Sequence, residues 1–159
     1  MDNFHRPLAP ISAAAWEDIE EEARRTLRRY LGARRVVDLC GPEGYDHSAV
    51  NLGRRRQIDS GLDGVATSQR AVLPLVEFKV PFTLTREDID NVARGAQDSD
   101  WQPLKDAALK LARAENLMVF EGLGSAGIEG MRPLSSNPAV PMPSAIADIP
   151  EAVARAVDA

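Results

Sequence analysis

The stretch from Ser12 to Pro42, SAAAWEDIEEEARRTLRRYLGARRVVDLCGP, decides how the rest of the chain is arranged. Its first part predicts an amphipathic helix that begins at Ser12, a residue type favoured as an N-cap, and stops at Gly32. Acidic side chains lead its polar face and arginines end it, an order that suits the helix dipole. The opposite face is apolar, so we expect the helix to lie on an apolar partner; this face carries Trp16, Ile19, Ala23, Leu27, Tyr30 and Leu31.

Strands are predicted on both sides of a long polar segment. A short one is expected from Ala33 to Cys40, where valines and a leucine precede a turn at Gly41 to Gly44. The clearest one is expected from Val76 to Phe82, where apolar and polar side chains alternate. Pro81 places that strand at a sheet edge or near a bulge.

The segment from Tyr45 to Leu75 between these strands is rich in Gly, Asp, Ser and Arg. It contains only two weak strand candidates, Ala49 to Leu52 and Gly64 to Ser68. An isolated hairpin is marginally stable in water. We therefore expect a long two-stranded excursion that needs a neighbour.

Three helices are predicted after this excursion. One follows Thr85, its expected N-cap, and closes at Gly95. The longest runs from Pro103 to Glu121 and carries a broad, alanine-rich apolar stripe, which is typical of a central support. The last begins at Asp148.

Four glycines between Gly122 and Gly130 allow two interpretations, a structural turn or a phosphate-binding loop. A dinucleotide-binding loop follows a strand and precedes a helix, whereas these glycines follow a helix. The structural turn is therefore favoured.

Length, charge and cysteine content limit the class of protein. A chain of 159 residues has the length of one domain or of one large piece of a bigger one. Its net charge of -5 argues against nucleic acid as a partner. A single cysteine fits a reducing compartment, and no apolar run is long enough to span a bilayer. These features lead us to expect a cytoplasmic protein.

No catalytic, cofactor-binding or metal-binding residues are expected. Cys40 is predicted to be a small buried apolar residue, and no spacing brings His5 or His47 near it. Carboxylates gather around Asp88, where caps and solvated loops explain them, although sequence alone leaves an acid-base pair there open. The residues themselves thus indicate no active site.

Several distinctive motifs occur in order along nearly the whole chain. They are Leu8-Ala9-Pro10-Ile11 with Ala15-Trp16, Arg34-Arg35-Val36-Val37-Asp38 with Gly41-Pro42, Val80-Pro81-Phe82-Thr83-Leu84, Ile89-Asp90-Asn91-Val92-Ala93-Arg94-Gly95, Asp98-Ser99-Asp100-Trp101, Phe120-Glu121-Gly122 and Gly127-Ile128-Glu129-Gly130. Together these motifs resemble the encapsulin shell proteins, a family once described as linocin-like bacteriocins. The similarity is greatest to actinobacterial members, and the motifs are specific as a set rather than singly.

The resemblance implies an α+β chain with the HK97-type fold of tailed-phage major capsid proteins and most of the axial domain missing. Residues 1–44 would form the N-terminal arm, the lumen-facing helix and the first peripheral-domain strand. Residues 45–75 would form the extended loop (E-loop) that reaches across a neighbouring subunit. Residues 76–133 would form the peripheral domain, with its spine helix at 103–121, and residues 134–159 would cross into the axial domain.

The implied function is that of a structural subunit, not an enzyme, of an icosahedral shell that assembles from copies of itself. Such shells enclose cargo, for example a peroxidase or a ferritin-like protein, through C-terminal targeting peptides. The peptide-binding residues expected here are Leu27, Tyr30 and Leu31 as an apolar groove, with Arg34 and Asp38 as polar contacts. The apolar three serve equally well to hold the helix to its own domain. No membrane and no specific nucleic acid are expected as partners.

Family members continue well beyond the position of Ala159, which is expected to fall within a helix. We therefore expect either a split subunit completed by a second polypeptide, which is favoured, or a truncation that assembles differently. Two functions from other classes stay open: a lytic or hydrolytic bacteriocin-like enzyme, and a phage-type capsid subunit that packages DNA. The acidic balance of the chain disfavours the second.

Overall fold

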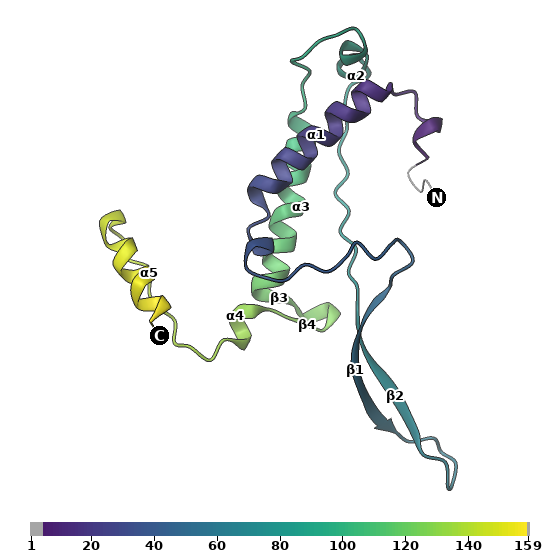
Figure 1. Cartoon of the computed structure of the whole chain (residues 1–159), viewed down its shortest axis with the longest axis vertical. Coiled ribbons are helices and arrows are strands. Elements are labelled where there is room, and N and C mark those ends of the chain that lie inside the picture. Colours follow the sequence, from purple (N-terminus) through teal and green to yellow (C-terminus); the bar gives the residue numbers. More distant parts are fainter. Residues whose placement is uncertain (1–4, 159) are drawn as a thin grey trace.

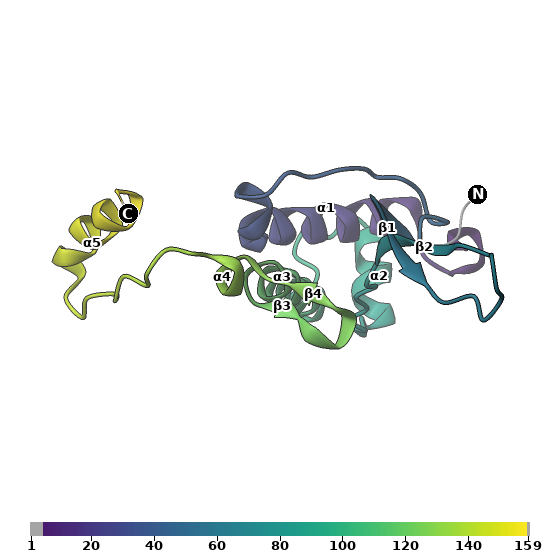
Figure 2. The same cartoon turned by 90° about the horizontal axis from the view of Figure 1, so that it is seen from below.

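The computed structural model describes residues 5–158 and has an α+β architecture. Two long helices, α1 (Ala13–Tyr30) and α3 (Gln102–Glu121), lie side by side, and the hairpin of β1 (Ala49–Ile58) and β2 (Thr67–Pro74) extends away from them (Figure 1). Helix α5 (Ile149–Val157) stands apart at the end of an irregular segment, as both views show (Figure 2). The molecule is therefore elongated, with one helical layer and two projecting parts.

Helix α1 confirms the first sequence prediction. The Ser12 hydroxyl accepts a hydrogen bond from the Ala15 amide at 3.2 Å, which satisfies one of the free amides of the first turn. The helix ends with Leu31 as its C-cap. Gly32 follows with a φ of -67°, so the chain leaves the helix without the left-handed glycine that often ends one.

The strand predicted from Ala33 to Cys40 is wrong. A short 3-10 helix, η2 (Ala33–Arg35), follows Gly32 instead, and no strand forms between Gly32 and Ala49. A strand needs a neighbouring strand to receive its backbone hydrogen bonds, and the described residues offer none here. Val36 and Leu39 are exposed as a result.

The predicted two-stranded excursion is present but longer than its weak signals suggested. Strands β1 and β2 pair antiparallel, with Val50 opposite Leu73 and Ile58 opposite Thr67. The register shifts between Asn51 and Arg55, where Gly53 has a φ of +67°. Most residues on both faces of the hairpin are exposed, so it has no core of its own.

The strand predicted from Val76 to Phe82 is also wrong. This segment runs without regular structure between the hairpin and helix α2 (Arg86–Ala93) (Figure 1). Its alternation is real, because Val76, Phe78 and Val80 are half-buried while the residues between them are exposed. The pattern predicted three of the four residues of this face correctly, because Phe82 is exposed, and the described residues provide no strand beside it.

The three later helices are confirmed. Thr85 caps α2 by accepting a hydrogen bond from the Asp88 amide at 3.1 Å, and Gly95 follows the helix with a φ of +97°. Helix α3 ends at Gly122, whose φ is +85°. Helix α5 begins directly after Asp148 and ends at Val157; Ala159, which was expected to fall within it, lies outside the described residues.

The glycine-rich segment after α3 is a structural turn, as predicted. Strands β3 (Gly122–Leu123) and β4 (Ile128–Glu129) pair antiparallel, and the 3-10 helix η3 (Gly124–Ala126) connects them. A short helix, α4 (Met131–Leu134), follows. Helix α3 precedes the first of these glycines, where a dinucleotide-binding loop has the strand of a βαβ unit, so the phosphate-loop interpretation has no support.

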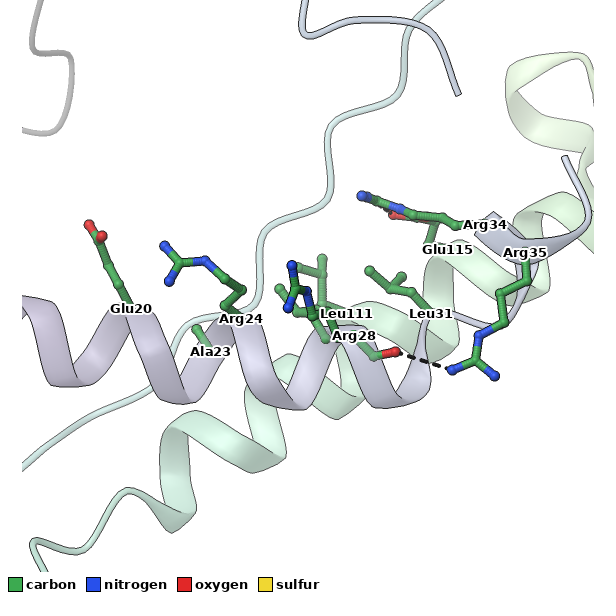
Figure 3. Close-up of a pocket in the computed structure, with 10 residues that line it drawn as sticks. Glu20, Ala23, Arg24, Arg28, Leu31, Arg34, Arg35, Leu111 and Glu115 are labelled. Atoms are coloured by element: carbon green, nitrogen blue, oxygen red, sulfur yellow. Dashed lines mark hydrogen bonds and ion pairs between the residues drawn. The ribbon is translucent and has the colours of Figure 1, made fainter. Parts of the chain in front are cut away.

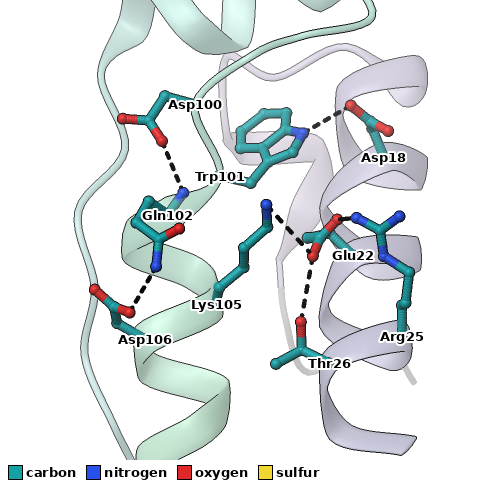
Figure 4. Close-up of polar contacts among 9 residues, drawn as sticks. All are labelled: Asp18, Glu22, Arg25, Thr26, Asp100, Trp101, Gln102, Lys105 and Asp106. Carbon is teal, nitrogen blue, oxygen red and sulfur yellow. Dashed lines mark hydrogen bonds and ion pairs between the residues drawn. The ribbon is translucent and has the colours of Figure 1, made fainter. Parts of the chain in front are cut away.

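The core is small and lies where α1 crosses the start of α3. Ile19, Trp101 and Leu104 form its centre. The indole Nε1 of Trp101 donates to Asp18 Oδ2 at 2.8 Å (Figure 4). Alanines of α3 are buried along the same side, which lets the two helices approach closely.

The buried face of α1 differs from the predicted one. Glu22 is buried, and its Oε1 accepts from the Thr26 hydroxyl at 3.2 Å (Figure 4). Arg25 pairs with Glu22, and Lys105 Nζ lies 3.9 Å from it. These partners allow a carboxylate on the packing face, because buried charge must be paired. Helix α1 is thus turned, with Leu27 only half-buried and Tyr30 40% exposed.

Candidate functional site

An open groove with a volume of about 560 Å³ runs between α1 and α3 (Figure 3). Its apolar floor consists of Ala23, Leu27, Leu31 and Leu111. Its rim is charged and consists of Glu20, Arg24, Arg28, Arg34, Arg35 and Glu115. An apolar floor with a few polar groups around it is typical of a binding site.

Helical periodicity builds both the floor and the rim. Residues four apart lie on one side of a helix, so Ala23, Leu27 and Leu31 form one row along α1. Glu20, Arg24 and Arg28 form the row beside it. Helix α3 closes the groove with Leu111 and Glu115, which are also four apart. While Glu22 is buried, this row is only partly covered, because Ala23 and Leu27 are half-buried.

The end of the groove is held by polar contacts between η2 and α3. Arg34 Nε lies 2.5 Å from Glu115 Oε1, and Arg34 Nη2 lies 2.7 Å from Glu115 Oε2. The hydrogen bond to Glu115 raises the pKa of Arg34, so this guanidinium stays charged. On the α1 side, Arg35 Nη2 donates to the Arg28 carbonyl at 3.4 Å (Figure 3).

The side chain of Asn116 joins α3 to the end of α1. Its Nδ2 donates to the Tyr30 carbonyl at 2.8 Å, and its Oδ1 accepts from the Ala33 amide at 2.9 Å. Ala33 is fully buried, so its amide needs an acceptor within the protein. One amide side chain therefore fixes both sides of the junction between α1 and η2.

Three of the five predicted peptide-binding residues line this groove: Leu27, Leu31 and Arg34. Leu31 is 9% exposed, so much of it also packs against its own domain. Tyr30 lines a separate polar cleft with Glu22 and Arg25. Asp38 is exposed and is not among the residues that line the groove. Their role in peptide binding stays a prediction.

Sequence reasoning missed the part of the groove that α3 supplies. Leu111 lay in the apolar stripe predicted for this helix, but nothing in the sequence indicated which part of the stripe α1 leaves open. The pairing of Arg34 with Glu115 also spans two elements far apart in the sequence. The rim arginines had a local signal, because Arg24 and Arg28 are one turn apart beside the apolar row.

The remaining candidates for chemistry are dispersed. Cys40 is exposed, which corrects the prediction that it is buried; the absence of a strand at 33–40 leaves it on the surface. His5 and His47 are exposed as well. Within residues 5–158, no cluster of three or more His, Cys, Asp or Glu side chains could hold a metal ion. In the same residues, no helix is long and apolar enough to cross a membrane.

Comparison with known proteins identifies the family. Residues 1–159 match the family described as "Encapsulating protein for peroxidase", and the chain belongs to this family of encapsulin shell proteins. The type 1 encapsulin shell protein of Rhodococcus erythropolis is 51% identical over 157 residues, and that of Brevibacterium linens is 50% identical over 157 residues. That of Mycobacterium tuberculosis is 47% identical over 157 residues. These relatives confirm the prediction that the motifs resemble actinobacterial members of the family.

The chain spans about 60% of the length of these relatives, while each alignment covers 99% of the chain itself. The relatives are named as shell proteins and not as enzymes. The comparisons give no support to the second polypeptide that the sequence led us to expect.

Proposed function

We propose that this chain is the N-terminal part of a structural, non-enzymatic subunit of a cytoplasmic protein shell with the HK97-type fold. It assembles with copies of itself and encloses a cargo protein, for which a peroxidase is the class that the family description suggests. The observation that carries the cargo-binding part is the apolar floor between α1 and α3, which residues 5–158 leave partly open. The assembly part is supported by the family and by the projecting hairpin.

The hairpin of β1 and β2 has the properties of an intersubunit arm. Val50, Leu52 and Val72 are exposed large apolar residues on a two-stranded sheet without a core. A hairpin of this kind is marginal in isolation, and unpaired edges invite pairing with another chain. Contact with a neighbouring subunit would cover both the apolar side chains and the edges. These properties support our proposal that residues 45–75 form the E-loop.

Replacing residues 54–70 of the hairpin by a short Gly-Ser turn in the intact protein is expected to abolish closed shells. The helical layer should stay folded, because those residues of the hairpin pair with each other and supply no residue of the core around Trp101. Negative-stain microscopy checks assembly, and circular dichroism checks the helices. Glu21→Gln, on the exposed face of α1, is the control and should assemble normally. Closed shells from the shortened protein would rule out the hairpin as an assembly arm.

The groove suits a short apolar peptide. Its floor is apolar over a row of α1 that spans two turns, from Ala23 to Leu31, with Leu111 opposite. An extended or helical peptide can place a few aliphatic side chains on such a floor, which is a common form of peptide recognition. We assign the floor to the C-terminal targeting peptide of the cargo. Tyr30 and Asp38 lie outside the groove and would contact only flanking parts of a longer peptide.

Leu27→Asp is expected to lower the affinity for an apolar peptide by about tenfold or more, because a carboxylate on the floor loses its water when the peptide binds. Leu109→Asp is a matched control: it is also a half-buried leucine of the helical layer, but it lines the polar cleft on the other side. Fluorescence anisotropy of a labelled peptide made of leucine, isoleucine, glycine and serine measures both. Equal affinities for the two variants would remove the groove from the binding site.

A further inference from the structure

The end wall of the groove is built by two adjacent residues of α3 acting on a segment far away in the sequence. Glu115 binds the guanidinium of Arg34, and Asn116 binds the backbone on both sides of the junction between α1 and η2. We propose that Glu115 and Asn116 are positioning residues of the groove. In this proposal Glu115 holds Arg34 in the end wall, and Arg34 shapes the groove without contacting a bound peptide. This inference rests on the proposed cargo-binding function.

The geometry of the ion pair argues against Arg34 as a direct peptide ligand. Two of its nitrogen donors, Nε and Nη2, are engaged by the two oxygens of Glu115 at 2.5 and 2.7 Å. A bidentate pair of this kind fixes the orientation of the guanidinium plane. The Glu115 side chain is 22% exposed, so it is more shielded from solvent than that of Arg34 at 46%. A guest carboxylate could take this edge of the guanidinium only by displacing Glu115.

Other cations on the same rim are better placed to meet a guest. Arg24 and Arg28 line the groove, and neither forms an ion pair with a carboxylate among residues 5–158. Of the rim carboxylates, Glu20 pairs with Arg6 and Glu115 with Arg34. We therefore place Arg34 in the end wall of the groove. Arg24 and Arg28 lie on the open rim, where a guest can reach them.

The backbone at the junction needs Asn116. The buried amide of Ala33 has Asn116 Oδ1 as its acceptor, and the Tyr30 carbonyl accepts from both Gly32 and Asn116 at the end of α1. Helix ends leave carbonyls without intrahelical partners, so a side chain that binds one of them fixes where the helix stops. Leu31, the last floor residue, lies between these two anchors. Its position on the floor is thus set from α3.

Charge reversal of the Arg34–Glu115 pair in the intact protein distinguishes two roles of Arg34: direct contact with the peptide, and formation of the end wall with Glu115. Arg34→Glu and Glu115→Arg should each weaken binding of the labelled apolar peptide by about fivefold, because each places like charges across the wall. The double variant, Arg34→Glu with Glu115→Arg, should bind within about twofold of the unchanged protein, because the pair re-forms. Binding by the double variant as weak as by Arg34→Glu would overturn the proposal.

Glu115→Gln tests the same point without depending on a re-formed pair. It leaves Arg34 intact and frees its donors, so direct contact with a guest predicts unchanged or stronger binding, whereas positioning through Glu115 predicts about threefold weaker binding. Hydrogen exchange at the Ala33 amide, which donates to Asn116, provides a readout without any peptide. Asn116→Ala should raise this exchange rate, and an unchanged rate would also overturn the proposal. If the unchanged protein does not bind the peptide, the proposed function fails, while the exchange measurement still tests the role of Asn116.

Discussion

Trp101→Ala is expected to unfold the helical layer, with a loss of about 3–5 kcal/mol in the free energy of unfolding. Trp101 is the largest side chain of a core whose other central members are only Ile19 and Leu104. It also holds α1 to the start of α3 through its hydrogen bond to Asp18. Because natural domains are stable by only about 5–15 kcal/mol, a loss of this size removes much of the total. Urea unfolding followed by circular dichroism measures it.

The two tryptophans of the chain provide a control for the polar part of this effect. Trp101→Phe keeps most of the packing and loses the 2.8 Å hydrogen bond to Asp18, so we expect a cost of about 1 kcal/mol. Trp16→Phe should be neutral or stabilising, because the buried Nε1 of Trp16 has no hydrogen-bond partner within residues 5–158. Equal effects of the two substitutions would show that the hydrogen bond to Asp18 contributes nothing.

Local signals predicted the helices and their ends. Ser12 and Thr85 cap their helices as residues of their type do, through contacts within the first turn. Gly122 ends α3 because its backbone angles exclude other residues. All of these interactions join residues close in the sequence, which is why sequence reasoning reached them.

The wrong predictions concern interactions that span the chain. The alternation that begins at Val76 describes a half-buried face correctly as far as Val80, but it cannot supply the neighbouring strand that a ladder requires. The burial of Glu22 depends partly on Lys105, more than eighty residues away. The burial of Glu22 fixes the rotation of α1 about its axis. This rotation decides which apolar side chains of α1 stay accessible.

The sequence therefore predicted the part of the candidate groove that α1 supplies, but not the part that α3 supplies. Leu27 and Leu31 belong to an apolar row that the sequence of α1 shows directly, and both line the groove. Leu111, Glu115 and Asn116 come from α3, and only the packing of the helices brings them to the same place. Tyr30 was expected beside Leu27, but the rotation of α1 places it in the polar cleft.

Gly122→Ala is expected to lower the free energy of unfolding by about 2–4 kcal/mol and to disrupt the β3–β4 turn. The backbone of Gly122 has φ +85° and ψ -178°, a region that residues with a Cβ almost never adopt. A Cβ here would also lie 2.5 Å from the Ile128 carbonyl oxygen and 2.6 Å from the Gly130 amide nitrogen. These are backbone atoms, so they cannot move aside without breaking the pairing of β3 with β4.

Gly124→Ala, two residues further on, is the matched control. A Cβ at Gly124 meets no atom within 4 Å, and its backbone lies outside the left-handed region, so we expect a change within about 0.5 kcal/mol. Urea unfolding compares the two variants, and hydrogen exchange at the Gly127 amide, which donates to the Gly124 carbonyl at 3.1 Å, reports on the turn itself. Peptide binding by Gly122→Ala should fall little while the protein stays folded, because the turn supplies no residue of the groove. Similar stability losses in both variants would contradict the steric argument and point to the sequence of the turn instead of its backbone.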